Sequence, residues 1–437
     1  MHTQNSQQKS IEKLSVEEIK AFQNQKLQDQ IAYLAKHSKF YQDLFEQNKI
    51  DWKRIKSTED LKLIPVTTKN DLQQRNLDFL CVPLPEIIDY STTSGTLGDP
   101  VTFGLTNQDL ERLADNELNS FQRIGVQKGD VVQMMTTIDR RFMAGLAYFL
   151  GLRKLGAGVI RVGAGVPQLQ WDSILKYQPK FLVAVPSFLL KMIDYAEKNN
   201  IDFNTSSVKA VLCIGEALRD RDLKPSLLAQ KITSKWNIQL FSTYASTEMS
   251  TAFTECEIGV GGHHQPDLII TEILDEENNE VENGELGELT ITTLGVEGMP
   301  LLRFKTGDLV RKHSEKCKCG SHTYRLGPVE GRKQHMIKYK GTTLYPPALQ
   351  DVLSHFDEIK LHLIEIYSNE LGTDEILIRL VSIDETDDFL AKIKDHFRAK
   401  MRVTPSIKFE NFETLQTVIF KPESRKPITF IDYRENS

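Results

Sequence analysis

Apolar and polar residues follow two different rhythms along the middle of the chain. Residues 108–125 show helical spacing, and after them short apolar runs alternate with amphipathic segments. The predicted order is strand 131–135, helix 142–155, strand 158–162, helix 171–177, strand 181–185, helix 187–199 and strand 210–214. Short apolar strands separated by amphipathic helices are typical of a parallel sheet that helices cover on both faces. We therefore predict an α/β fold for this part of the chain.

The two ends of the chain have other patterns. Ser15 and Glu18 form a possible capping box, so the chain is expected to begin with helices. Between residues 267 and 308, short strands with Gly- and acid-rich turns predict a small antiparallel section, as at 268–274 and 288–293. After Gly331 the predicted order is a strand, helix 347–355, strands 361–367 and 375–381, helix 387–401 and strand 406–412. This pattern predicts a large domain over residues 1–331 and a small α+β domain over residues 332–437.

Composition and charge narrow the class of protein. The chain has 437 residues, of which 40% are hydrophobic and 26% charged, as in a globular protein with a sizeable core. Its net charge of −6 supplies no basic field, so no nucleic-acid partner is expected. The first residues lack the apolar stretch of a signal peptide, and no apolar run is long enough to span a bilayer. We expect a cytoplasmic protein without a membrane partner.

A loop of hydroxyls and glycines is the strongest candidate for chemistry. Residues 90–100 contain no bulky apolar side chain before Leu97. Glycine lets backbone N–H groups approach an anion, and Ser and Thr hydroxyls add further donors, so the loop suits a polyphosphate. The Gly-Lys-Ser/Thr ending of a Walker loop is absent, which disfavours a P-loop kinase or GTPase. Taken alone, such a loop is more often a plain surface turn.

Two further segments suit a nucleotide. The aromatic ring of Tyr244 offers a flat face to a base, and the carboxylate of Glu248 offers a hard oxygen ligand to Mg²⁺. Asp308, in a Gly-Asp turn, could accept hydrogen bonds from both hydroxyls of a ribose. Each of these segments taken singly could also be an ordinary loop or turn.

The order of these motifs resembles the adenylate-forming superfamily. The motifs are Thr-Ser-Gly-Thr-x-Gly-x-Pro (93–100), Tyr-x-x-Thr-Glu (244–248), Arg-Phe-Lys-Thr-Gly-Asp (303–308), Gly-Arg (331–332) and Ile-Lys-x-x-Gly-x-x-x-x-Pro (337–346). Within that superfamily the chain is most similar to the phenylacetate-CoA ligase family, in length as well as in motif order. The resemblance implies a two-step reaction, in which a carboxylate and ATP give an acyl-adenylate and pyrophosphate, and a thiol then displaces AMP. It also implies a mobile C-terminal domain that acts as a lid.

The resemblance assigns roles to individual residues. The β- and γ-phosphates would be held by Thr93, Ser94, Gly95, Thr96 and Gly98. Adenine would be enclosed by Tyr244 and by Gly215, Glu216 and Ala217, with Thr247 beside them, and the ribose would be bound by Asp308 with help from Arg325. Glu248 would bind Mg²⁺. Lys426 would be the adenylation lysine, whose ammonium bridges the carboxylate and an α-phosphate oxygen. The catalytic residues would thus be Lys426, Glu248 and Thr96.

Several positions depart from the family pattern. Leu97 and Asp99 replace residues of the phosphate loop that are usually Thr and often Lys, so a hydroxyl is lost and a negative charge lies near the anion. Arg425 replaces a Gly before the candidate lysine, and a solvated terminal Lys426 is the alternative there. Gln334 replaces the usual Asp of the hinge, which must absorb a large dihedral change as the small domain swings. These departures keep open a non-catalytic nucleotide-binding relative.

Cysteine and histidine spacing predicts a metal site. Five scattered cysteines do not form a secreted disulfide framework. The thiols of Cys256, Cys317 and Cys319 with the imidazole of His263 could supply the four ligands of a tetrahedral structural zinc. Relatives of phenylacetate-CoA ligase look similar here, with His seven residues after Cys, which favours His263 over His264. The alternative is a set of free cysteines.

The acid and the acceptor are the least specified features. By analogy with the family, Phe142, Ala144, Gly145 and Tyr148 would border the acyl pocket and leave room for a flat ring, which fits an aryl or arylacetic acid such as phenylacetate. Ordinary helix packing explains the same residues. The expected partners are a small carboxylic acid, ATP with Mg²⁺, and coenzyme A. A carrier protein or an amine as acceptor, and a homodimer, are left open.

Overall fold

The computed structural model describes residues 11–93, 101–339, 342–369, 373–421 and 427–434. The chain divides into two compact units, a large unit (Met1–Thr306 with Val310–Pro328) and a small unit (Gly307–Leu309 with Val329–Ser437).

The large unit begins with helices. The predicted capping box is confirmed, because the Ser15 hydroxyl accepts from the Glu18 N–H and the Ser15 N–H donates to the Glu18 carboxylate. The N-terminal helices are η1 (Ile11–Lys13), α1 (Val16–His37), α2 (Lys39–Gln47), η2 (Trp52–Arg54), η3 (Thr58–Leu63), α3 (Lys69–Gln74), η4 (Asn76–Phe79) and η5 (Leu84–Glu86).

The predicted parallel sheet is present, with every predicted strand and helix within a few residues of its expected place. Its strands lie in the order β7, β6, β5, β3, β4, and each neighbouring pair is parallel. The strands are β3 (Val131–Met134), β4 (Gly158–Arg161), β5 (Phe181–Ala184), β6 (Ala210–Cys213) and β7 (Gln239–Ser246). The helices are α4 (Asn107–Arg123), α5 (Met143–Leu155), α6 (Pro167–Tyr177), α7 (Pro186–Lys198), η6 (Phe203–Thr205) and α8 (Leu227–Thr233).

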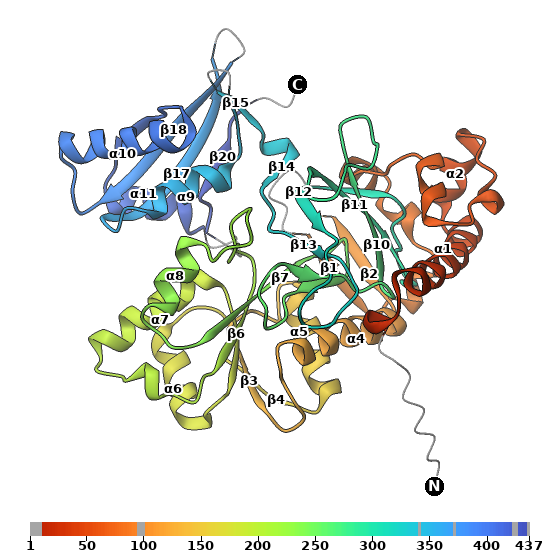
Figure 1. Cartoon of the computed structure of the whole chain (residues 1–437), viewed down its shortest axis with the longest axis horizontal. Helices are drawn as coiled ribbons and strands as arrows, with labels where there is room; N and C mark the ends of the chain where they lie inside the picture. The colour runs from red at the N-terminus through yellow and green to blue at the C-terminus, as the bar shows by residue number, and fades with distance from the viewer. Residues whose placement is uncertain (1–10, 94–100, 340–341, 370–372, 422–426, 435–437) are drawn as a thin grey trace. The chain divides into compact units, whose positions relative to one another are not determined.

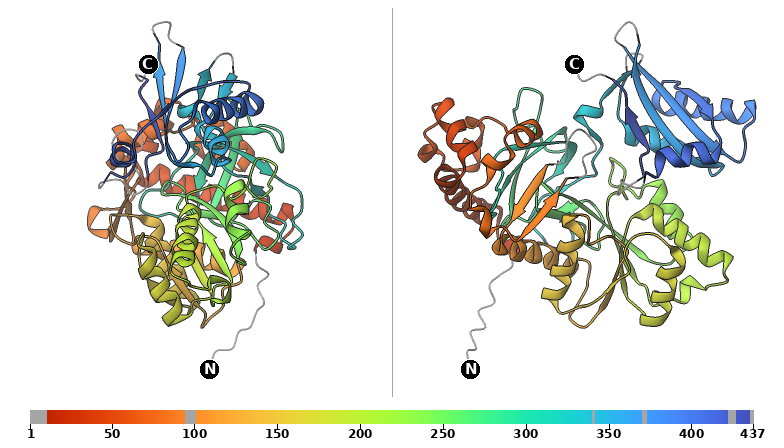
Figure 2. Two further views of the ribbon diagram at one scale, coloured as in Figure 1. Left: turned by 90° about the vertical axis from the view of Figure 1, so that its left-hand side faces the viewer. Right: turned by 180° about the vertical axis from the view of Figure 1, so that it is seen from behind.

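Helices cover both faces of this sheet (Figures 1 and 2), and alternate strand residues enter two different cores. Leu182 and Ala184 pack with α6, α7 and α8 in a core that includes Trp171 and Trp236. Val183 belongs to the other core, which contains Phe121 of α4 and Tyr148 of α5. Because both faces are covered, β5 and β6 are buried along their whole length, which explains their continuous apolar sequence.

Antiparallel strands extend the sheet beyond β7. The path continues through β8, β9, β13, β12, β11 and β10. Their bounds are β8 (Thr251–Thr254), β9 (Gly262–His263), β10 (Ile269–Leu274), β11 (Leu286–Thr293), β12 (Phe304–His313) and β13 (Arg325–Leu326). A separate two-stranded hairpin, β1 (Asp89–Thr92) with β2 (Thr102–Leu105), flanks the hydroxyl-rich loop. The expected fold class, an α/β large domain with an antiparallel section and a small α+β domain, is confirmed.

The small unit is built on a four-stranded sheet in the order β19, β18, β17, β20. Its strands and helices are β14 (Gly331–Arg332), η7 (Lys333–His335), β15 (Ile337–Tyr339), β16 (Thr342–Leu344), α9 (Pro346–Ser354), β17 (Ile359–Ser368), β18 (Asp374–Ser382), α10 (Asp387–Met401), β19 (Ser406–Phe409), α11 (Phe412–Ile419) and β20 (Phe430–Asp432). The predicted strand 406–412 was too long, because Asn411 caps a helix: its side chain accepts from the Thr414 N–H. In the described part of the chain, no helix is long and apolar enough to cross a membrane.

Candidate functional site

Thr93 and Val101, the described residues on either side of the candidate phosphate loop, follow β1 and precede β2. Thr93 is buried, and its N–H donates to the Val101 carbonyl while its hydroxyl accepts from the Val101 N–H, both at 3.0 Å. The hairpin therefore brings the two ends of the loop together. The predicted phosphate ligands Ser94, Gly95, Thr96 and Gly98 lie outside the described residues, and so do Leu97, Asp99, Arg425 and Lys426.

The candidate base and magnesium residues lie at the end of β7. Tyr244 is paired with Phe253 of β8, and their rings stack with centroids 6.2 Å apart. Thr247 and Glu248 follow in a tight turn that ends at Ser250, whose φ is +46°. The Ser250 hydroxyl donates to the Thr247 carbonyl at 3.2 Å. The turn places Thr247 and Glu248 directly beyond the end of β7, four residues at most from Tyr244 in sequence.

A buried arginine that sequence reasoning missed supports this turn. Arg112 of α4 donates from Nη1 to the Ser250 carbonyl at 2.6 Å and from Nη2 to the Thr251 hydroxyl at 3.0 Å. It also donates to the carbonyls of Leu268 and Leu294. Burial lowers the pKa of Arg112 to about 10, so the guanidinium is still charged at neutral pH. The Arg112 guanidinium thus donates to four acceptors, one of which is the Ser250 carbonyl at the end of the turn that contains Glu248.

The predicted adenine segment follows the carboxyl end of β6. Gly215 has a φ of +77°, a conformation that favours glycine. The Glu216 carboxylate accepts from the backbone N–H and the hydroxyl of Ser187, at the start of α7, at 2.8 and 2.7 Å. The Ala217 carbonyl accepts from the Ser226 hydroxyl at 3.3 Å. Ligands of open α/β sheets bind beyond the carboxyl ends of the strands, and β6 and β7 are neighbours, so Ala217 and Tyr244 share that edge.

Asp308, the predicted ribose ligand, belongs to the small unit. It is buried, and Arg332 donates to its carboxylate from Nε at 2.9 Å. The same two residues are register partners of β12 and β14. Gln334, the predicted hinge residue, lies two residues further on in the short helix η7. The Gly-Arg motif therefore supplies an ion-pair partner to the Gly-Asp motif.

The predicted acyl-pocket residues lie at and within α5. Phe142 precedes the helix, and Tyr148 packs edge-to-face against Phe121 in the core. Gly145 approaches the chain before the helix so closely that an added Cβ would lie 1.8 Å from the Thr137 carbonyl oxygen. Only glycine fits there, so a packing reason for Gly145 stands beside its predicted role in the pocket.

The four predicted zinc ligands converge in the large unit, although they come from distant parts of the sequence. The ligand atoms of Cys256, His263, Cys317 and Cys319 all lie within 4.8 Å of one another. The two sulfurs of Cys256 and Cys317 are 3.7 Å apart, and the Cys319 sulfur is 3.6 Å from His263 Nε2. A zinc tetrahedron with bonds of about 2.3 Å to sulfur and 2.0 Å to nitrogen has edges of about 3.8 Å and 3.5 Å between those atoms. The spacing fits such an ion.

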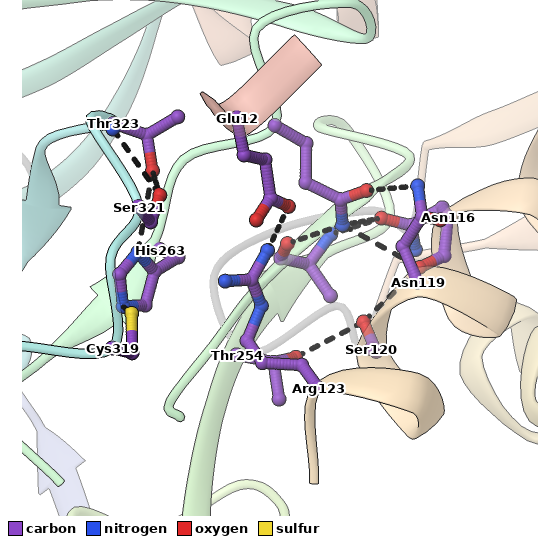
Figure 3. A network of polar contacts seen from close by, with 12 residues as sticks. Glu12, Asn116, Asn119, Ser120, Arg123, Thr254, His263, Cys319, Ser321 and Thr323 are labelled. Atoms are coloured by element: carbon purple, nitrogen blue, oxygen red, sulfur yellow. Dashed lines mark hydrogen bonds and ion pairs between the residues drawn. The ribbon is translucent and has the colours of Figure 1, made fainter. Parts of the chain in front are cut away.

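The surroundings of the cluster suit a cation. His263 Nδ1 lies 3.2 Å from the Thr323 hydroxyl, which leaves Nε2 to face the Cys319 sulfur (Figure 3). Burial, with Arg123 and Arg325 nearby, lowers the pKa of His263 to about 3, so the imidazole is neutral, as a ligand must be. Burial, together with the neighbouring thiols, raises the pKa of Cys256 to about 12. A divalent cation would offset the charge of these thiolates. His264 instead bonds the Ile269 carbonyl through Nε2 and stacks on Tyr324.

Arg325 lies beside this cluster, on the strand β13 that pairs with β9. Its guanidinium donates to the carbonyls of Val260 and Glu315, at 2.7 and 2.9 Å. Both contacts are with backbone atoms of the segments that carry zinc-ligand candidates. The predicted help to the ribose stays a prediction, and the observed contacts give Arg325 a structural role.

Comparisons with known proteins give the family. Residues 86–298 match the family model described as AMP-binding enzyme. The chain is 26% identical over 426 residues to the phenylacetate-coenzyme A ligase of Thermus thermophilus, which covers 91% of this chain and 94% of that protein. It is 25% identical to the Escherichia coli enzyme of the same name, over 80% of each chain. A crystal structure of 2-hydroxyisobutyryl-CoA ligase with 2-HIB-AMP has the same fold, with a TM-score of 0.84 at 22% identity over 99% of this chain and 94% of that one. The chain belongs to the phenylacetate-CoA ligase family of AMP-binding, adenylate-forming enzymes.

Proposed function

We propose that this protein is an ATP-dependent carboxylic acid–CoA ligase that acts through an acyl-adenylate. Its substrates are a small carboxylic acid, ATP and coenzyme A. The observation that carries this proposal is the similarity to phenylacetate-coenzyme A ligases, which runs through 91% of the chain and so includes the nucleotide motifs of both units. The acid we propose is an aryl or arylacetic acid, because four relatives bear the name phenylacetate-coenzyme A ligase.

The first half-reaction brings two anions together. An oxygen of the acid attacks the α-phosphorus of ATP, the bond from that phosphorus to the bridging oxygen breaks, and pyrophosphate leaves. Positive charge must neutralise the crowded oxygens, and Mg²⁺ supplies part of it. Glu248 would hold the metal, the hydroxyls of Thr93, Ser94 and Thr96 would hold the leaving phosphates, and Lys426 would bridge the acid and the α-phosphate. In the second half-reaction the thiol of CoA attacks the acyl carbon and AMP leaves.

A zinc ion at Cys256, His263, Cys317 and Cys319 would be structural. All four positions are filled by protein, so no open position remains for a substrate. Such an ion would join the segment after β8 to the segment after β12 within the large unit. It would thereby brace the β7–β8 pair that carries Tyr244.

Pyrophosphate release tests the function. Purified protein would be given ATP, Mg²⁺ and a panel of arylacetic, aryl, fatty and short 2-hydroxy acids, with and without CoA. The expected result is release that depends on an aryl or arylacetic acid, with the acyl-CoA and AMP as products when CoA is present. Adenylation without consumption of CoA would point to a carrier protein or an amine as acceptor, and ATP binding without turnover of any acid would point to a non-catalytic relative.

A variant separates the half-reactions. Lys426→Ala should abolish acid-dependent pyrophosphate release, because the bridging charge is lost, while it still forms acyl-CoA from supplied acyl-AMP. Lys421→Ala, in the same terminal region, is the control and should keep both activities. Equal pyrophosphate release by the Lys426 variant and the unmodified protein would remove Lys426 from the mechanism.

A further inference from the structure

A buried ion pair joins the loop after β6 to β7 and to the end of β8, and the first two of these belong to the proposed ATP site. Arg219 donates to the Glu255 carboxylate from Nε at 3.0 and 3.3 Å and from Nη2 at 3.0 Å, in a bidentate arrangement. The Glu255 side chain is 1% exposed and that of Arg219 15% exposed. Planar, bidentate pairs of this kind fix geometry as well as charge.

The carboxylate of Glu255 also accepts hydrogen bonds from the backbone. Besides Arg219, it accepts from the backbone N–H of Ser242 at 3.0 Å and from that of Gly261 at 3.3 Å. The Glu255 N–H in turn donates to the Ser242 carbonyl at 2.9 Å. Glu255 is therefore bound to β7, two residues before Tyr244, and to the turn that leads to His263.

Arg219 lies two residues after the adenine segment. The chain from Gly215 leaves β6, and the Leu218 carbonyl accepts from the Ser226 N–H at 2.8 Å. Arg219 itself forms an isolated bridge with Pro225. Its guanidinium also abuts Gly259, where an added Cβ would lie 2.4 Å from Nη2. The arginine therefore links the loop after β6 to the ends of β7 and β8.

We infer that the Arg219–Glu255 ion pair is a positioning element of the ATP site, which holds the segment of Gly215, Glu216 and Ala217 against the strand that carries Tyr244. The inference rests on the proposed function, because it assumes that this segment and this ring enclose adenine. Neither residue of the pair is among those assigned to the phosphates, the ribose, the metal or the acid. Its action is to fix the distance between two walls of the slot that binds the base of ATP, so its loss should weaken the binding of AMP, ATP and the acyl-adenylate.

Binding of AMP by calorimetry is the first test, because it needs no turnover. Arg219→Lys keeps the charge but has a single nitrogen, which cannot reproduce the planar contact that Nε and Nη2 make together, and we expect it to weaken AMP binding about tenfold. Arg219→Met should weaken it further. Because Arg219→Met leaves a buried carboxylate without its cation, the double variant Arg219→Met with Glu255→Gln removes that charge and guards against a failure to fold. Arg75→Met removes an arginine held by Asp43 and Asp78 in the N-terminal helices, and this control should bind AMP normally.

Steady-state kinetics distinguish a positioning role of the ion pair from a general effect on the stability of the protein. With saturating acid, the KM for ATP should rise about tenfold in Arg219→Lys while kcat stays within about twofold, and the KM for CoA should not change. The metal content of each variant is measured on the same sample. Unchanged AMP affinity in a folded Arg219→Met or double variant would overturn the inference, and so would a loss of metal that leaves AMP affinity intact. If the unmodified protein binds neither AMP nor ATP, the proposed function fails first, and the inference falls with it.

Discussion

The backbone N–H of Thr93 donates to the Val101 carbonyl, and the Thr93 hydroxyl accepts from the Val101 N–H, so two residues on either side of the candidate phosphate loop are bound to each other twice. The pair continues the register of the β1–β2 hairpin, in which Thr92 lies opposite Thr102. These two hydrogen bonds fix the distance between Thr93 and Val101. An anion that binds at the motif therefore does not have to bring these two residues together.

Thr93→Val should therefore weaken the use of ATP. Valine has nearly the same shape as threonine but leaves the Val101 N–H without its acceptor in a buried position, which costs about 1–2 kcal/mol of folding free energy. We expect a raised KM for ATP in pyrophosphate release and a lower denaturant midpoint. Thr93→Ser keeps the hydroxyl and should restore most of both losses. A valine variant with an unchanged KM for ATP would show that the hydrogen bond between the Thr93 hydroxyl and Val101 does not contribute to the use of ATP.

His263 and His264 should differ in their effect on metal content. We expect about one zinc ion per chain in freshly purified protein, because all four positions of a tetrahedral site are supplied. His263→Ala should lose the metal, since its Nε2 faces the Cys319 sulfur at 3.6 Å. His264→Ala removes a ring stacked on Tyr324, so it should lower the stability but retain the metal. Metal analysis with thermal unfolding checks both variants.

Cysteine variants provide the matched control for that experiment. Cys317→Ser should release the metal, whereas Cys81→Ser changes an equally buried thiol elsewhere and should not. A chelator should lower the unfolding temperature of the unmodified protein and of Cys81→Ser but leave that of Cys317→Ser unchanged. Purified protein without zinc that is as stable with the chelator as without it would contradict a structural metal.

The parallel sheet could be predicted from short stretches of sequence, because the burial of each strand determines the residues of that strand alone. Strands such as β5 and β6 are buried on both faces, so they appear in the sequence as short apolar runs. The helix α11 was missed because Leu415 and Ile419, its buried residues, occur in a short apolar stretch that is equally compatible with a strand. Its capping residue, Asn411, was the available signal.

The supporting residues of the site could not be predicted in the same way. On α4, Arg112, Asn116 and Ser120 recur at helical spacing and resemble a solvent-exposed face, yet all three are buried. Each bonds to a residue of β8, as Figure 3 shows for Ser120 and Thr254. Only the tertiary fold shows which carbonyls Arg112 meets. Likewise, nothing in the local sequence connects Arg219 with Glu255, which are 36 residues apart. Motifs predicted the groups that would touch the substrate, whereas their supports depend on long-range packing.

Arg112→Lys should raise the Mg²⁺ requirement. A lysine ammonium cannot reach the four acceptors that the guanidinium bonds, so the Ser250 carbonyl loses its buried donor and the turn that carries Glu248 loosens. We expect a loss of about 1–3 kcal/mol of folding free energy and a higher Mg²⁺ concentration for half-maximal pyrophosphate release. Arg153→Lys, at an exposed position on α5, is the control. A destabilised Arg112 variant with a normal Mg²⁺ requirement would show that Arg112 contributes to the stability of the fold but not to the binding of Mg²⁺.

Glu117 should make the stability of the large unit depend on pH. This residue of α4 is 3% exposed, and burial raises its pKa to about 8, against about 4.3 in an unfolded chain. Between these values the folded state holds a proton that the unfolded state has lost, so this group lowers the free energy of unfolding as pH rises, by at most about 1.4 kcal/mol per pH unit. Below the lower value both states are protonated, and above the higher value both are ionised, so the contribution is flat outside the window. Glu117→Gln should therefore match the unmodified protein near pH 4 and exceed it increasingly toward pH 8 in urea unfolding. Glu111→Gln, an exposed change on the same helix, should leave the slope unaltered, and parallel curves for Glu117→Gln and the unmodified protein would show that Glu117 is ionised in the fold.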